Sequence, residues 1–170
     1  MSYSEFVRSR FKSGEKIAEE MTPHKAALLS LCCLRFVQVS GDLDRAKKYA
    51  IYNKESHGFP THPENVQHFK NFNPTPSQCE LLHAAIGIAG EAGELLDAVR
   101  KHVFEGEPLD RENVIEELGD IDFYLTAARL AAKTDLGEVL TYNQAKLSKR
   151  YESGYSDKAA RERADKAGAE

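Results

Sequence analysis

Apolar residues recur at steps of three and four positions through most of the 170-residue chain. Alternating, β-branched stretches that would indicate strands are scarce, so the pattern predicts an all-α fold. In the first third of the chain we expect helices over residues 4–21, 23–39 and 42–54. Residues 56–76 carry four prolines and several turn formers, which predicts a loop or a lid.

The clearest helix start in the sequence is at Thr75. This capping residue is followed by Pro76, which suits a first helical turn, and Gln78 stands three residues after the cap. We expect a long helix from this point that ends near Gly106.

Two further helices are predicted downstream. Asp110 is placed to cap a helix over residues 112–133, and Asp135 to cap another over residues 136–153. The short connection near Gly106 predicts that the first two of these three helices form an antiparallel hairpin. The tail after residue 155 is polar, and we expect it to lie on the surface or to fray.

Two acidic pairs are the most informative chemical feature. Glu91 and Glu94 fall in one predicted helix, and Glu117 and Asp120 fall in the next. A spacing of three residues places each pair on one helical face. Small residues occupy neighbouring turns of these faces, which leaves room between the helices: Ala84, Gly87, Ala98 and Ala127.

If the two acidic faces meet, four carboxylates converge in a partly desolvated space and repel one another. A divalent cation would relieve the repulsion. Because Glu91, Glu94, Glu117 and Asp120 are hard oxygen donors with no cysteine among them, Mg²⁺ is favoured, and Mn²⁺ is expected to substitute for it. Mg²⁺ commonly bridges to phosphate oxygens, so the predicted substrate is a polyphosphate.

The third predicted helix carries the opposite charge. Asn143, Lys146 and Arg150 share one face of it, and these groups are suited to binding phosphate oxygens.

Composition narrows the class of partner. The formal charge of −4, without a long basic block, argues against a nucleic-acid polymer. Three cysteines, with Cys32 adjacent to Cys33, fit no disulfide framework and indicate a reducing compartment. The N-terminus has no signal-like apolar core, and no run of 18 apolar residues occurs, so we expect a cytoplasmic protein without a membrane segment.

Other readings of these residues remain open. Glu116 or Asp122 could replace a predicted ligand, and Asp97 could extend the cluster or pair with Lys101. Zinc at the loop histidines is disfavoured, because their spacing fits no compact site and no cysteine joins them. A di-iron site at His83 is disfavoured, because that chemistry needs two Glu-x-x-His motifs and only one is present. The loop histidines are His57, His62 and His68.

Three segments resemble the MazG type of all-α nucleoside triphosphate pyrophosphohydrolases, including phage-encoded relatives. They are GEAGELLDAVRK, EELGDIDFYL and NQAKLSKRYESGYS. The resemblance implies a MazG-like helical bundle that cleaves nucleoside triphosphates to monophosphate and pyrophosphate. It assigns Glu91, Glu94, Glu117 and Asp120 as catalytic metal ligands, and Asn143, Lys146 and Arg150 as substrate-binding residues.

On this basis we expect three regions: a helical N-terminal extension with a Pro/His-rich loop at 1–70, a MazG-like catalytic bundle at 71–155 and a polar tail at 156–170. A homodimer or homotetramer is expected, because so small a bundle exposes apolar surface. A preference for GTP or dGTP and a role in a phage nucleotide pool, within the host cytoplasm, are further expectations. Alternatives are a dUTPase-like or phosphoribosyl-ATP pyrophosphatase-like enzyme, or a module that binds Mg²⁺ and nucleotide without turnover.

Overall fold

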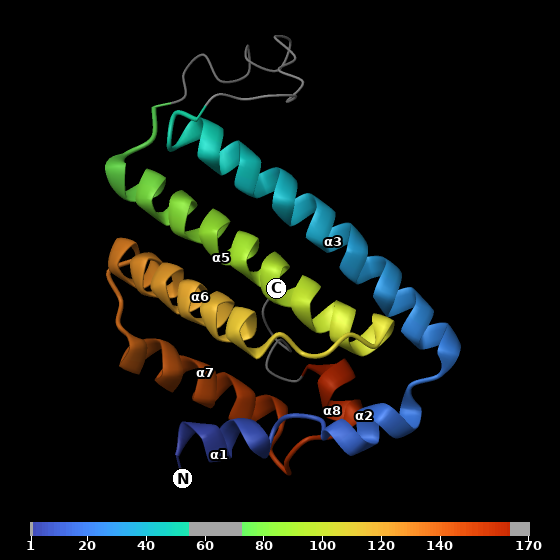
Figure 1. The fold of residues 1–170 in the computed structure, drawn as a ribbon. Helices are drawn as coiled ribbons and strands as arrows, with labels where there is room; N and C mark the ends of the chain where they lie inside the picture. Colours follow the sequence, from blue (N-terminus) through green and yellow to red (C-terminus); the bar gives the residue numbers. More distant parts are fainter. Residues whose placement is uncertain (1, 55–72, 164–170) are drawn as a thin grey trace. The chain divides into compact units, whose positions relative to one another are not determined.

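The computed structural model describes residues 2–54 and 73–163. Within these ranges every regular element is helical, which confirms the all-α expectation (Figure 1). In chain order the elements are α1 (Tyr3–Arg8), α2 (Gly14–Glu20), α3 (Pro23–Ala50), α5 (Pro76–Arg100), the π-helical turn η2 (Lys101–Glu105), α6 (Arg111–Ala131), α7 (Leu136–Arg150) and α8 (Asp157–Glu162).

The chain divides into two compact units. Residues 23–133 form the larger one, and residues 1–22 together with 134–170 form the smaller one. In the larger unit α5 lies between α3 and α6 and packs against both (Figure 1). The larger unit therefore contains both predicted acidic helices.

The predicted hairpin of α5 and α6 is present, with the predicted caps. The Thr75 side chain accepts a hydrogen bond from the Gln78 amide, and the Gln78 side chain accepts one from the Thr75 amide. Asp110 caps α6 by accepting from the Asn113 amide at 3.1 Å. Gly106 ends the first arm in the left-handed conformation, with φ of 74°, which glycine adopts without strain.

The prediction of separate helices over 23–39 and 42–54 is wrong, because α3 is continuous from Pro23 to Ala50. Gly41 lies in the gap between the two predicted helices, but a helix tolerates one glycine when packing holds it in place. That packing comes from α5: a Cβ at Gly93 would lie 1.9 Å from the Ser40 Oγ. Only a glycine allows the two helices to approach so closely.

The predicted helix over 4–21 is also two elements, α1 and α2. Ser13 interrupts it, because its side chain accepts a hydrogen bond from the Lys16 amide and so caps a new helix. In the tail, residues 157–162 form α8 instead of fraying: the Ser156 side chain caps it, and Lys12 pairs with Asp157 at 3.0 Å. The predicted helix over 136–153 ends at Arg150.

Large apolar side chains remain exposed on α3. Leu28 is 57% exposed and Val39 is 63% exposed. By length and composition α3 is also the one described helix able to cross a membrane, with a mean hydropathy of 1.4 over its most apolar window. One such helix is weak evidence for a membrane span, so the expected lack of a membrane segment stays a prediction.

Candidate metal centre

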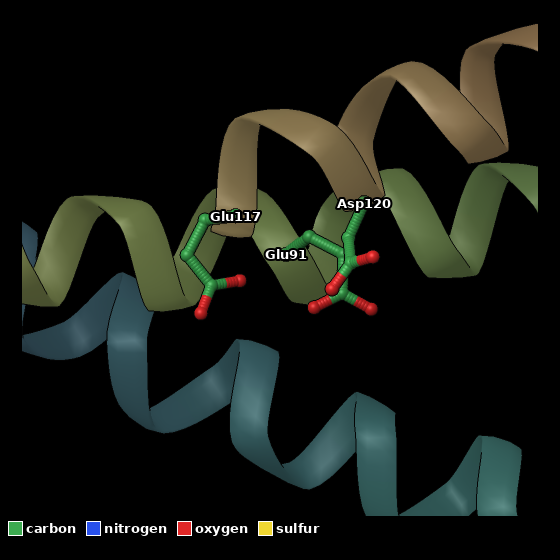
Figure 2. Close-up of side chains that lie close together, drawn as sticks. All are labelled: Glu91, Glu117 and Asp120. Atoms are coloured by element: carbon green, nitrogen blue, oxygen red, sulfur yellow. The ribbon is translucent and has the colours of Figure 1, made fainter. Parts of the chain in front are cut away.

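Helices α5 and α6 bring three of the four predicted acidic ligands together. Glu91 comes from α5, and Glu117 and Asp120 come from consecutive turns of α6. One carboxylate oxygen of each residue lies within 4.8 Å of the other two. Figure 2 shows the three carboxylates gathered on one side of the α5–α6 pair.

Glu117 is the most enclosed member of this group, which we call the acidic cluster. The residue is 4% exposed, and its Oε1 accepts a hydrogen bond from the Asn113 side-chain amide at 3.0 Å. Burial, followed by the charges of Glu94 and Glu91, raises the pKa of Glu117 from 4.5 to about 7. Burial and the neighbouring carboxylates therefore both disfavour the charged form of Glu117.

The pKa of Glu91 is also raised. Burial raises its pKa, the Lys47 ammonium opposes that shift, and the charges of Glu94 and Asp120 add to it. Two carboxyl groups in one cluster are thus less acidic than usual. Their preferred partner is a cation that supplies more than one positive charge.

The small residues predicted beside the acidic faces have a direct structural purpose. A Cβ on Gly87 would lie 2.3 Å from the Tyr124 ring, so the ring of α6 rests on bare backbone of α5. Tyr124 lies one turn beyond Asp120 on α6. Gly87 thus sets how closely the two acidic helices approach each other.

Glu94, the fourth predicted ligand, is exposed and does not belong to the three-residue cluster. It lines an adjacent cleft of about 450 Å³ between α3, α5 and the start of α6. Asp44, Asp97, Asp110 and Asn113 also line this cleft. Glu94 nevertheless acts on the cluster through its charge, which raises the pKa of both Glu91 and Glu117.

Lys47 is a residue of this region that the sequence did not suggest. Its side chain is 4% exposed, and its Nζ lies 3.0 Å from an Asp44 carboxylate oxygen and 3.9 Å from Glu91 Oε1. Two adjacent lysines, Lys47 and Lys48, look like solvated surface residues in the sequence. Only the packing of α3 on α5 shows that one of them is enclosed.

His83 belongs to an aromatic group and not to the acidic cluster. Its Nε2 lies 2.8 Å from the Tyr52 hydroxyl, and its ring meets the Tyr124 ring edge-on. The di-iron reading therefore gains no support from the described residues. His57, His62 and His68 lie outside the described residues, as does most of the predicted lid at 56–76.

The acidic residues that were open alternatives are not members of the cluster. Glu116 and Asp122 are exposed on α6. Asp97 pairs with Lys101 at 2.6 Å and with Arg100 at 2.9 Å, so it is neutralised within its own helix. These three carboxylates do not take part in the cluster among the described residues.

The predicted phosphate-binding residues lie on α7, in the smaller unit. Asn143, Lys146 and Arg150 are all half-buried, as a shared face would require. The Asn143 side chain accepts a hydrogen bond from the Tyr3 hydroxyl at 3.4 Å, and the Arg150 guanidinium lies over the Tyr151 ring. Their role toward a substrate stays a prediction.

The donor set of the cluster fits a hard divalent cation. It consists of carboxylate oxygens from Glu91, Glu117 and Asp120, and burial together with the charges of Glu94 and Glu91 raises the pKa of Glu117. Oxygen donors of this kind suit Mg²⁺ and Mn²⁺ better than zinc, which prefers nitrogen and sulfur. The arrangement is therefore suited to hold a metal ion against an anionic substrate.

Comparison with known proteins agrees with this chemistry. Residues 81–155 match the family model described as the MazG nucleotide pyrophosphohydrolase domain. The match spans α5 from Leu81, all of α6 and all of α7, and so includes every predicted site residue. No curated protein and no solved structure matched the chain.

Proposed function

From the MazG nucleotide pyrophosphohydrolase domain that residues 81–155 match, we propose that this protein is a Mg²⁺-dependent enzyme that hydrolyses nucleoside triphosphates to nucleoside monophosphate and pyrophosphate. The observation that carries the proposal is the meeting of Glu91, Glu117 and Asp120 within 4.8 Å. Those carboxylates belong to the two acidic pairs that mark the family resemblance.

Each acidic residue has a distinct part in this mechanism. Glu91, Glu117 and Asp120 would hold the cation, and the Asn113 amide fixes the orientation of Glu117. A metal bound there would supply Lewis-acid activation of the phosphate and of the attacking water, and would neutralise charge on the leaving pyrophosphate. Glu94 lines the cleft and is not a member of the three-residue cluster, so we assign it to orient the water and to accept its proton.

The cleft beside Glu94 is the proposed site of the nucleoside. Its volume of about 450 Å³ is within the range of small-molecule sites. Its wall carries several carboxylates, including Glu94, Asp97 and Asp110. Guanine presents two N–H donor groups on one edge, which suit carboxylate acceptors, so we propose a preference for GTP or dGTP.

The phosphate chain requires cations besides the metal. We assign this part to Lys146 and Arg150, with Asn143, because their charge and spacing are those of the family's phosphate-contacting motif. This assignment rests on the sequence motif and on the family match that includes α7.

We further propose that the enzyme is a homo-oligomer. Helix α3 exposes Leu28, Leu31 and Val39, and such a row of apolar side chains is costly in water. A second copy covering α3 would remove this cost and add the apolar core that a three-helix layer lacks.

The expected location is the cytoplasm, and service in a phage nucleotide pool is consistent with the sequence resemblance.

The proposal is tested by incubating the full chain and Mg²⁺ with a panel of ribo- and deoxyribonucleoside triphosphates, including dUTP and phosphoribosyl-ATP. Monophosphate and pyrophosphate are then quantified. We expect release in equal amounts, fastest with GTP or dGTP. Asp120→Asn is expected to abolish turnover, whereas Asp122→Asn, which alters an exposed acid two residues away, is the matched control. Metal binding without turnover of any triphosphate would instead indicate a non-catalytic binding module.

A further inference from the structure

A buried lysine beside an acidic cluster requires an explanation that the family motif does not supply. Lys47 lies on α3, outside the matched residues 81–155. Its side chain is almost fully enclosed, with Nζ 3.0 Å from Asp44 and 3.9 Å from Glu91. The ammonium also lies 5.3 Å from the centre of the Tyr124 ring. Burying a charged side chain is costly unless charged partners compensate for it.

We propose that Lys47 is a positioning residue that serves as an internal counter-ion of the metal centre: it holds Glu91 in place and, through its own positive charge, limits how tightly the cluster binds a divalent cation. The inference rests on the proposed function in that it takes the acidic cluster to be the metal site. Lys47 and the metal share Glu91 as a partner, so each weakens the hold of the other on that carboxylate.

Asp44 adjusts the strength of this effect. It bonds to Lys47 and also to Lys48, so it neutralises part of the positive charge that would otherwise act on Glu91. The groups that face the Lys47 ammonium are therefore Asp44 from its own helix, Glu91 from α5 and the Tyr124 ring from α6. Removing either Lys47 or Asp44 changes the net charge beside the cluster, in opposite directions.

Opposite charge changes give opposite predictions for metal binding. Replacing Lys47 by methionine keeps most of the side-chain volume and removes a repulsive charge, so the metal should bind more tightly. Replacing Asp44 by asparagine leaves Lys47 less neutralised, so the metal should bind more weakly. Structural damage alone would weaken binding in both variants, which separates it from the proposed effect.

The test is the affinity of the full-length chain for Mn²⁺ and Mg²⁺, measured by calorimetry without nucleotide. We expect Lys47→Met to tighten binding by about tenfold and Asp44→Asn to weaken it by several-fold. Lys47→Arg retains the positive charge, so this variant should bind both metals with the wild-type affinity. Asp42→Asn, which removes an exposed carboxylate paired with Arg45 on the same helix, is the matched control and should leave the affinity unchanged.

The outcomes distinguish this inference from the proposed function. If the wild-type protein binds neither metal, both are overturned. If the wild-type protein binds metal but Lys47→Met binds it equally or less tightly, the counter-ion inference alone is overturned. If Lys47→Met does not fold, the Asp44→Asn variant provides the test. Unchanged or tighter metal binding in that variant would contradict the proposal.

Discussion

Replacing Glu117 by glutamine tests the charge conflict at the centre of the site. Glutamine has nearly the same shape and keeps an oxygen that can accept the bond from the Asn113 amide, but it carries no charge. If burial and the charges of Glu94 and Glu91 disfavour the Glu117 carboxylate when no metal is bound, this substitution should stabilise the metal-free protein. An ordinary structural glutamate would give the opposite result.

The magnitude follows from the pKa of Glu117. Raising that pKa from 4.5 to about 7 corresponds to about 3 kcal/mol, at ~1.4 kcal/mol for each tenfold change in proton affinity. The folded chain then binds more protons than the unfolded chain between these two pH values, so metal-free stability falls as the pH rises through this window. Glu117→Gln should therefore be more stable than wild type by up to about 3 kcal/mol at about pH 8, and no more stable at about pH 4.

The assay is urea unfolding of both proteins in EDTA at several pH values, repeated with excess Mg²⁺. Adding metal should stabilise the wild type and leave Glu117→Gln nearly unchanged, because the variant has lost a ligand. Turnover of the variant should fall by at least about a hundredfold. Asp122→Asn, at an exposed position of the same helix, should behave as wild type. A loss of stability in Glu117→Gln at about pH 8 in EDTA would refute the reasoning.

Three further substitutions test other parts of the structure. Gly87→Ala should destabilise the protein by about 1–3 kcal/mol in thermal melts, because its Cβ would strike the Tyr124 ring; Gly90→Ala, whose Cβ meets nothing within 4 Å, should be neutral or stabilising. Asp110→Ala removes the cap of α6 and should cost ~1 kcal/mol by urea titration, with unchanged stability contradicting the capping role. Lys146→Met should raise KM for the triphosphate severalfold with little change in folding, and an unaltered KM would remove Lys146 from the phosphate site.

Local sequence signals predicted much of the larger unit correctly. The caps at Thr75 and Asp110 and the glycine at position 106 mark the ends of the hairpin, because capping and left-handed turns depend on a few neighbouring residues. Where the same signals competed with packing, they misled. Two separate helices were predicted on either side of Gly41, yet α3 is continuous there, where Ser40 packs against Gly93.

The candidate site, too, was predicted only in part from the sequence. Spacing alone placed each acidic pair on one helical face, and the structure brings Glu91, Glu117 and Asp120 within 4.8 Å of one another. Spacing gave no reason to separate Glu94 from them, and it gave none to single out Lys47. Both distinctions depend on where α3 packs against α5.

The sequence by itself determined that this chain is helical, that its acidic pairs share helical faces and that their chemistry suits a divalent cation. These properties follow from periodicity and side-chain type, which operate within a few turns of chain. Only the tertiary structure decided which carboxylates meet and which lysine lies beside them. Burial and through-space charge depend on residues distant in sequence, such as Lys47 and Glu91, and no local pattern records their distance.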